Sequence, residues 1–305
     1  MKRWILPLVA VAIAGAIAWP FVFGGGTVEV KGRSFTVEHR ISDTGDLSRD
    51  VPTRNRAALE AGQAILCSWD RDRYLYFWSD GSKAGFDVAF LDAAGKVLQT
   101  GRINPFKGRG SDLDDEGLAS QAEARRALFL PEGTVESLSL SVGDTVALSS
   151  DLARAKPEPM TSINILGKPV HVEVVDTAKR RSRGLMHRPS MSKDEGMLFL
   201  YPKEQSSPYL SFYMRNTLMS LDIAYFDASG KLVNVVPTAR AENLGTKGAA
   251  ITAPAQGAAQ YVLEVPFGWF RDNGFTDDKG KPAKPVSFEV TEDLRRRAST
   301  ADKHP

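Results

Sequence analysis

The chain has 305 residues, 42% hydrophobic and 25% charged, which is enough for two domains of moderate size. Its formal net charge of +2 comes from well-mixed acidic and basic residues, which argues against nucleic acid as a partner. The single cysteine, Cys67, excludes an intrachain disulfide and a thiolate metal cluster. Because it lies in an apolar run, we interpret it as a buried structural thiol.

The N-terminus has the pattern of a targeting segment. Lys2 and Arg3 precede an apolar run over residues 4–23, which predicts export. Residues 1–26 are interpreted either as a cleaved signal peptide or as an N-terminal membrane anchor. We therefore expect a periplasmic or extracellular protein, or one anchored in the inner membrane through residues 4–23.

Residues 27–152 are predicted to form a β-rich domain. Alternating and aromatic-rich segments predict strands at 28–30, 35–37, 74–78 and 86–91. Lys31-Gly32 has the composition of a hairpin turn between the first two strands. A short helix is expected over 53–59, with Thr53 as its N-cap.

An acidic segment in this domain resembles a calcium-binding loop. Oxygen ligands at positions 1, 3, 5 and 12 of the pattern would come from Asp112, Asp114, Glu116 and Glu123. The basic, glycine-rich residues 107–110 cannot supply the entering helix, so a solvated acidic loop is favoured. The four methionines at 186, 197, 214 and 219 are interpreted as core residues rather than as Cu(I) ligands. No metal or other cofactor is expected.

The chain repeats itself at a fixed offset. Residues 86–97 and 221–232 match position by position, with Asp87 opposite Asp222 (222 − 87 = 135). The same offset relates Gly32 to Gly167, Glu38 to Glu173 and Gly133 to Gly268, and the alignment slips by one residue around Gly62 and Gly196. We therefore predict a tandem duplication, with homologous domains at 27–152 and 161–290 joined by a linker at 153–160.

Three helical segments are expected in the second half. The first spans 177–183 after a capping Asp176 or Thr177, and its basic residues are interpreted as a solvated face, with an anion site as the less favoured alternative. A helical turn is predicted at 266–273, and a last strand at 286–290. Residues 291–305 are predicted to be a short helix capped by Thr291, followed by a disordered tail from Ser299.

The densest group of chemically active side chains lies between residues 210 and 222. A cation, an amide and a carboxylate occur there beside aromatic rings, a combination that suits a polar ligand or a sugar. The candidate ligand-binding residues are Met186, Phe212, Tyr213, Met214, Arg215, Asn216, Thr217 and Asp222. The alternative is a local turn at Asn216-Thr217 held together by Asp222.

The first copy has lost most of this polar set. Residues 77–82 keep the aromatic pair but have Ser, Asp and Gly where the second copy has Met214, Arg215 and Asn216. The carboxylate is shared between Asp87 and Asp222, so it is expected to serve the fold as much as a ligand.

The second copy resembles the family catalogued as domain of unknown function 192. The resemblance rests on Arg183-Gly184-Leu185-Met186, the 212–217 segment, Leu221-Asp222 and the closing 261–269 segment, and it covers about residues 170–278. It implies a compact, mostly β (α+β), barrel-like domain with short helices that is frequently exported, and it implies no established reaction. The first copy then looks like a degenerate member of the same family.

Three functions remain open at this stage. Binding of a small polar molecule, a glycan or an envelope protein through Tyr213, Arg215, Asn216 and Asp222 is favoured over catalysis. The enzymatic alternative is a hydrolase or lyase acting on envelope polysaccharide, with Asp222 and Glu264 as acid and base. A third possibility is an assembly scaffold, which would show an exposed apolar patch and no pocket.

Overall fold

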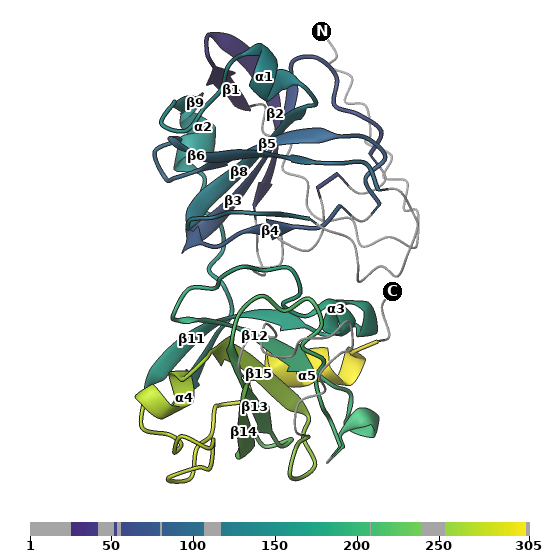
Figure 1. The fold of residues 1–305 in the computed structure, drawn as a ribbon, viewed down its shortest axis with the longest axis vertical. Helices are drawn as coiled ribbons and strands as arrows, with labels where there is room; N and C mark the ends of the chain where they lie inside the picture. The colour runs from purple at the N-terminus through teal and green to yellow at the C-terminus, as the bar shows by residue number, and fades with distance from the viewer. Residues whose placement is uncertain are drawn as a thin grey trace, which may run out of the picture.

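The structure is a computed structural model that describes residues 26–41, 52–53, 56–79, 81–106, 117–207, 209–238 and 254–302. It is mostly β, with two curled sheets in tandem and a few short helices (Figure 1), so the predicted fold class is confirmed. The targeting segment lies outside the described residues. Among the helices that the structure describes, none is long and apolar enough to cross a membrane.

The first repeat contains a seven-stranded sheet with the order β6-β5-β8-β3-β2-β1-β9, and β4 pairs separately with β7. Its elements are β1 (Gly26–Val30), β2 (Arg33–Ile41), β3 (Gln63–Arg73), β4 (Tyr76–Phe77), β5 (Phe86–Leu91), β6 (Val97–Ile103), β7 (Leu118–Ala119), β8 (Ala124–Pro131), α1 (Thr134–Ser137), β9 (Val146–Leu148) and α2 (Ser150–Arg154).

The second repeat contains a six-stranded sheet with the order β10-β11-β12-β15-β13-β14. Its elements are β10 (Ser162–Ile165), β11 (Lys168–Val175), α3 (Ala178–Arg183), β12 (Glu195–Leu200), η2 (Lys203–Gln205), β13 (Leu221–Phe226), β14 (Leu232–Thr238), β15 (Tyr261–Pro266), α4 (Trp269–Asp272) and α5 (Glu292–Thr300). Neighbouring strands are antiparallel except β2 with β3 and β11 with β12, which occupy the same place in the two sheets.

Strand pairing supports the duplication. Asp87 pairs with Leu130 on β8, and Asp222 pairs with Val265 on β15, so both partners keep the offset of 135. The hairpin turns at Lys31-Gly32 and Leu166-Gly167 both adopt positive φ angles, at 50° and 78° and at 48° and 87°. Such a turn matches the twist of the strands it joins, and glycine takes this conformation without strain.

One detail of the predicted alignment is wrong. Gly196 pairs with Val172, and the equivalent residue Val37 pairs with Ala64, so Ala64 and not Gly62 is the counterpart of Gly196. The difference is 196 − 64 = 132, which is a slip of three residues. It falls between β2 and β3, where no strand register constrains the length of the chain.

Each sheet is covered by apolar side chains on both of its faces. Alternate residues along a strand point to opposite faces, so Leu263 and Val265 of β15 belong to one core and Val262 to the other. Cys67 is fully buried in the first repeat, and burial raises the pKa of its thiol to about 12. This environment is that of the structural thiol expected from the sequence.

The short elements follow their capping signals only in part. Thr177 caps α3 and Thr291 caps α5, each through a side-chain oxygen that accepts a backbone N–H. Residues 56–59 are not helical, and 286–290 form only isolated bridges instead of a strand. The predicted disorder from Ser299 is wrong up to residue 302, because α5 extends to Thr300 and Asp302 then bonds to α3.

Candidate functional site

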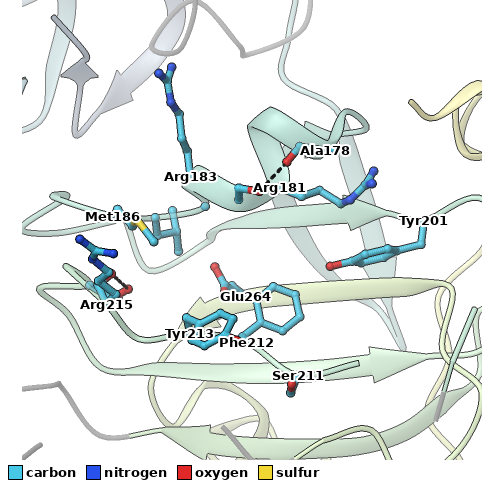
Figure 2. A pocket seen from close by; sticks show the side chains of 14 residues that line it. Ala178, Arg181, Arg183, Met186, Tyr201, Ser211, Phe212, Tyr213, Arg215 and Glu264 are labelled. Carbon is cyan, nitrogen blue, oxygen red and sulfur yellow. Dashed lines mark hydrogen bonds between the residues drawn. The ribbon is translucent and has the colours of Figure 1, made fainter. Parts of the chain in front are cut away.

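A cavity of about 460 Å³ opens in the second repeat beside α3 and β15, within the size range of small-molecule sites (Figure 2). It is lined by Ala178, Arg181, Ser182, Arg183, Gly184, Leu185, Met186, Tyr201, Ser211, Phe212, Tyr213, Arg215, Thr217 and Glu264. The α3 helix, the segment after it, β15 and the 211–217 segment therefore converge on one space.

Five of the eight predicted ligand-binding residues line this cavity: Met186, Phe212, Tyr213, Arg215 and Thr217. Met214 does not, because its side chain is 2% exposed in the neighbouring core. Asn216 occupies a turn with φ of 53°, and its carbonyl accepts the N–H of His187 at 2.7 Å. The local-turn interpretation thus fits Asn216 better than a ligand contact does.

Asp222 has a structural role. Its two carboxylate oxygens accept the backbone N–H groups of Gly268 and Phe270, each at 3.0 Å, and these groups begin the short helix α4. Burial raises the pKa of Asp222, and the two hydrogen bonds oppose that rise. In the first repeat Asp87 likewise accepts the N–H of Val135 at the start of α1, which explains why the carboxylate is shared.

The predicted acid and base pair is wrong. Asp222 pairs with Val265, whereas Glu264 pairs with the next residue, Ile223. Because successive residues of a strand point to opposite faces, the Asp222 and Glu264 side chains lie on different sides of the sheet. Glu264 faces the cavity, and the two carboxylates cannot act together on one substrate.

Glu264 and Tyr201 place two polar groups inside the cavity. The Glu264 side chain is buried, and Figure 2 shows the Tyr201 hydroxyl directed toward it. Burial raises the pKa of Tyr201 to about 12, with Arg181 opposing and Glu264 adding to the rise, so the hydroxyl stays protonated. Among the described residues the backbone N–H of Tyr201 donates to the Gln260 carbonyl, and the side-chain hydroxyl has no hydrogen-bond partner. Tyr201 was not predicted, because it lies just past β12 and far in sequence from the aromatic cluster.

The basic face predicted for α3 is solvated at Lys179 and partly at Arg180, but not at Arg181 and Arg183. The Arg181 side chain is 7% exposed and donates hydrogen bonds to Asp302 at 2.6 Å and to the Leu200 carbonyl at 2.9 Å. Its guanidinium lies 4.6 Å from the centre of the Tyr201 ring. Arg183 is also buried. These contacts come from residues far away in the sequence, which the local pattern of the helix cannot reveal.

Aromatic rings form much of the remaining wall. Phe212 packs edge-to-face against Phe199, with 4.9 Å between ring centroids, which fixes its orientation. Tyr213 is 58% exposed, and Arg215 is exposed beside it. The cavity therefore combines a carboxylate, a phenol and aromatic surface, with Arg215 at its exposed side.

The corresponding space in the first repeat is filled. Trp69, Phe77 and Phe129 stand where the second repeat has Tyr201, Phe212 and Glu264. The Phe77 ring lies 4.8 Å from that of Phe129 and 6.1 Å from that of Trp69, and all three side chains are buried. Three aromatic rings thus occupy the volume that is a polar cavity in the second repeat.

The calcium-loop hypothesis is tested only at Glu123, because Asp112, Asp114 and Glu116 lie outside the described residues. The Glu123 carboxylate accepts a hydrogen bond from the Ser192 hydroxyl at 2.6 Å, which joins the two repeats. Among the side chains that the structure describes, no group of three or more His, Cys, Asp or Glu residues is placed to hold a metal ion.

Two stretches, residues 28–148 and 161–280, each match the model of the domain family DUF192, described as Uncharacterized ACR. The first copy is therefore a full match and not a degenerate one, although its cavity residues differ. None of the curated proteins matches the chain.

Two solved structures align with part of the chain. A protein of unknown function from Novosphingobium aromaticivorans DSM 12444 aligns at 24% identity and a TM-score of 0.34, over 42% of this chain and 84% of its own. A candidate transcription regulator from Sinorhizobium meliloti 1021 aligns at 20% identity and a TM-score of 0.32, over 42% of this chain and 90% of its own.

Proposed function

The chain belongs to the uncharacterised family DUF192, and we propose that it is a non-catalytic binding protein whose second-repeat cavity takes a small polar molecule or a sugar unit of a glycan. The observation that carries this proposal is the convergence of the Tyr201 hydroxyl and the Glu264 carboxylate on one cavity that is walled by aromatic rings. A few polar groups that converge in a largely apolar pocket are the usual contacts of a small ligand.

The lining fits a sugar in particular. The Glu264 carboxylate and the Tyr201 hydroxyl both belong to the lining of this cavity, where they offer sugar hydroxyls an acceptor and a donor. Phe212 and Tyr213 offer apolar surface on which the C–H face of a sugar packs. The volume of about 460 Å³ suits one such unit.

Binding is favoured over catalysis because the second carboxylate is missing from the cavity. Glycoside hydrolysis ordinarily uses two carboxyl groups that flank the scissile bond. Asp222 lies on the other face of the sheet and is engaged by α4, which leaves Glu264 as the carboxylate among the cavity-lining residues.

The setting that we propose is the cell envelope. This part of the proposal rests on the targeting pattern of residues 1–26, which predicts an exported or membrane-anchored protein. An envelope glycan is then the partner that best combines the location with the chemistry of the cavity.

Exposed apolar residues near the cavity support a second candidate, an envelope protein as the partner. Tyr209 is 81% exposed and Leu218 is 39% exposed, on the same segment as Tyr213. Exposed side chains of this kind are typical of protein contact surfaces.

Isothermal titration calorimetry tests the proposal with defined probes: the disaccharide of N-acetylglucosamine and N-acetylmuramic acid, a trimer of N-acetylglucosamine, and a dimer of galacturonic acid. We expect at least one to bind the wild type, and Glu264→Gln to weaken binding at least tenfold. The matched control is Glu204→Gln, the same change at an exposed residue of η2 that lies outside the cavity lining. The assignment would be contradicted if both variants bound equally weakly, or if Glu264→Gln bound as tightly as the wild type.

A further inference from the structure

The first repeat contacts the segment that forms the wall of the cavity. Trp78, which follows β4 and is 2% exposed, packs against Met186 in a small apolar cluster with Tyr76. The Arg183 guanidinium lies over the Trp78 ring, with 4.9 Å from Cζ to the ring centroid. His187 meets the same ring edge-on, at 5.5 Å between centroids. Arg183 and Met186 both line the cavity, so a residue of the first repeat supports its wall.

Buried charges hold this contact in place. Arg73, at the end of β3, forms a salt bridge with Glu173 of β11. Arg188 donates two hydrogen bonds of 2.8 Å to the same carboxylate, one to each oxygen. The three side chains are between 1% and 6% exposed. Removing Arg73 from this cluster would leave the buried Glu173 carboxylate with one cation fewer, which would cost free energy. The 183–188 segment is therefore held at one end by the contact of Arg183 with Trp78 and at the other by the bonds of Arg188 to Glu173.

One sequence position has taken two roles in the two repeats. Trp78 and Tyr213 are related by the offset of the duplication, 213 − 78 = 135. Tyr213 is 58% exposed and lines the cavity, whereas Trp78 is buried against the second repeat. Aromatic rings fill the equivalent of the cavity in the first repeat. Trp78 therefore lines no cavity of its own repeat and packs against the cavity wall of the second repeat instead.

We propose that the cavity is a composite site in which Trp78 is a positioning residue that holds the 183–186 segment of the wall through its contacts with Arg183 and Met186. The inference rests on the proposed function and adds to it the dependence of binding on the first repeat. The Arg183 guanidinium points away from Glu264 and Tyr201 (Figure 2) and rests on Trp78, so this contact fixes the position of the wall residues that follow Arg183, namely Gly184, Leu185 and Met186. Trp78 acts through Arg183 and does not itself line the cavity.

Amide hydrogen exchange on the full chain tests the positioning role without any ligand. We expect Trp78→Ala to speed exchange across residues 183–188 by about tenfold, and Trp78→Phe, which keeps an aromatic face, to restore most of the protection. Leu130→Ala is the control, because Leu130 lies in a core of the first repeat that does not include Trp78. If Leu130→Ala and Trp78→Ala speed exchange in this segment equally, the effect is general destabilisation and the inference is wrong.

A double-mutant cycle tests the consequence for binding, with the disaccharide of N-acetylglucosamine and N-acetylmuramic acid as the probe. We expect Trp78→Ala and Arg183→Ala each to weaken binding about tenfold, and the double variant to bind no more weakly than Arg183→Ala alone. Effects that multiply, or a Trp78→Ala variant that binds like the wild type, would overturn the inference. A wild type that binds no saccharide would instead defeat the proposed function, and the exchange experiment would still decide whether Trp78 positions Arg183.

Discussion

Asp222 and Glu264 sit on neighbouring strands of one sheet, yet their carboxylates lie on opposite faces of it. One serves the short helix α4, and the other faces the cavity. We therefore expect Asp222 to contribute to stability and Glu264 to contribute to ligand binding, and mutation of each residue should show these two effects separately.

We expect Asp222→Asn to lower the free energy of unfolding by about 1 to 3 kcal/mol, because one backbone N–H would then face an amide donor. Saccharide binding by the folded variant should stay within about twofold of wild type. Glu264→Gln should show the reverse, with weaker binding and nearly unchanged stability. Urea unfolding and calorimetry on both variants check this, and a loss of binding in Asp222→Asn without loss of stability would contradict the assignment.

The boundary between the repeats should be sensitive to pH through Glu195. Burial raises the pKa of this carboxyl to about 7, with Arg73 and Arg71 opposing and Glu173 and Asp194 adding to the rise. Between about pH 4.5 and pH 7 the unfolded chain has lost a proton that the native protein keeps, so this group lowers stability as the pH rises through that window.

Glu195→Gln removes the titrating group. We expect its stability relative to wild type to increase by about 1 to 3 kcal/mol between pH 5 and pH 8, as measured by urea unfolding. Burial lowers the pKa of the nearby His171, which gives the opposite slope, but His171 is present in both proteins and cancels in the difference. A difference that is constant with pH would show that Glu195 does not titrate in this range.

Two turn glycines of the second repeat should differ in their tolerance of a side chain. Gly167 and Gly230 have φ angles of 87° and 84°. A Cβ atom on Gly167 would meet nothing within 4 Å, whereas on Gly230 it would lie 2.4 Å from the Phe288 carbonyl oxygen.

Alanine at Gly167 should therefore cost about 1 kcal/mol from the positive φ alone. Alanine at Gly230 should cost about 2 to 4 kcal/mol, because backbone must also move. Thermal unfolding of the two variants gives the comparison directly. Equal losses of stability would mean that the packing of Phe288 against this turn is not rigid.

The sequence allowed the fold to be predicted well because its signals are local. Paired glycines such as Gly32 and Gly167 mark equivalent turns, and the alternation of apolar residues marks the strands between them. The helix caps Thr177 and Thr291 act on the residues that follow them directly. The strand predicted at 286–290 is only a pair of isolated bridges, because its partners near residues 165 and 231 are distant in sequence and a local pattern does not show how many residues pair.

The candidate site was predicted only in part, for a related reason. The 212–217 segment is dense enough to be recognised, and it does line the cavity. The direction in which Asp222 and Glu264 point depends on strand register, which a sequence pattern does not specify. The roles of Tyr201 and Trp78 depend on contacts across the sheet and between repeats, and nothing in their neighbourhood signals them.

Tyr201→Phe is the most direct test of the central claim, because it deletes one oxygen atom of the cavity lining and keeps the ring. Calorimetric titration with the saccharide probes, together with thermal unfolding, compares this variant with wild type and with Tyr209→Phe, an exposed tyrosine outside the cavity lining. We expect Tyr201→Phe to bind about tenfold more weakly while its melting temperature is nearly unchanged, since the ring is kept and only the hydroxyl is lost. A Tyr201→Phe protein that binds the probe as tightly as wild type would contradict the claim that this cavity is the binding site.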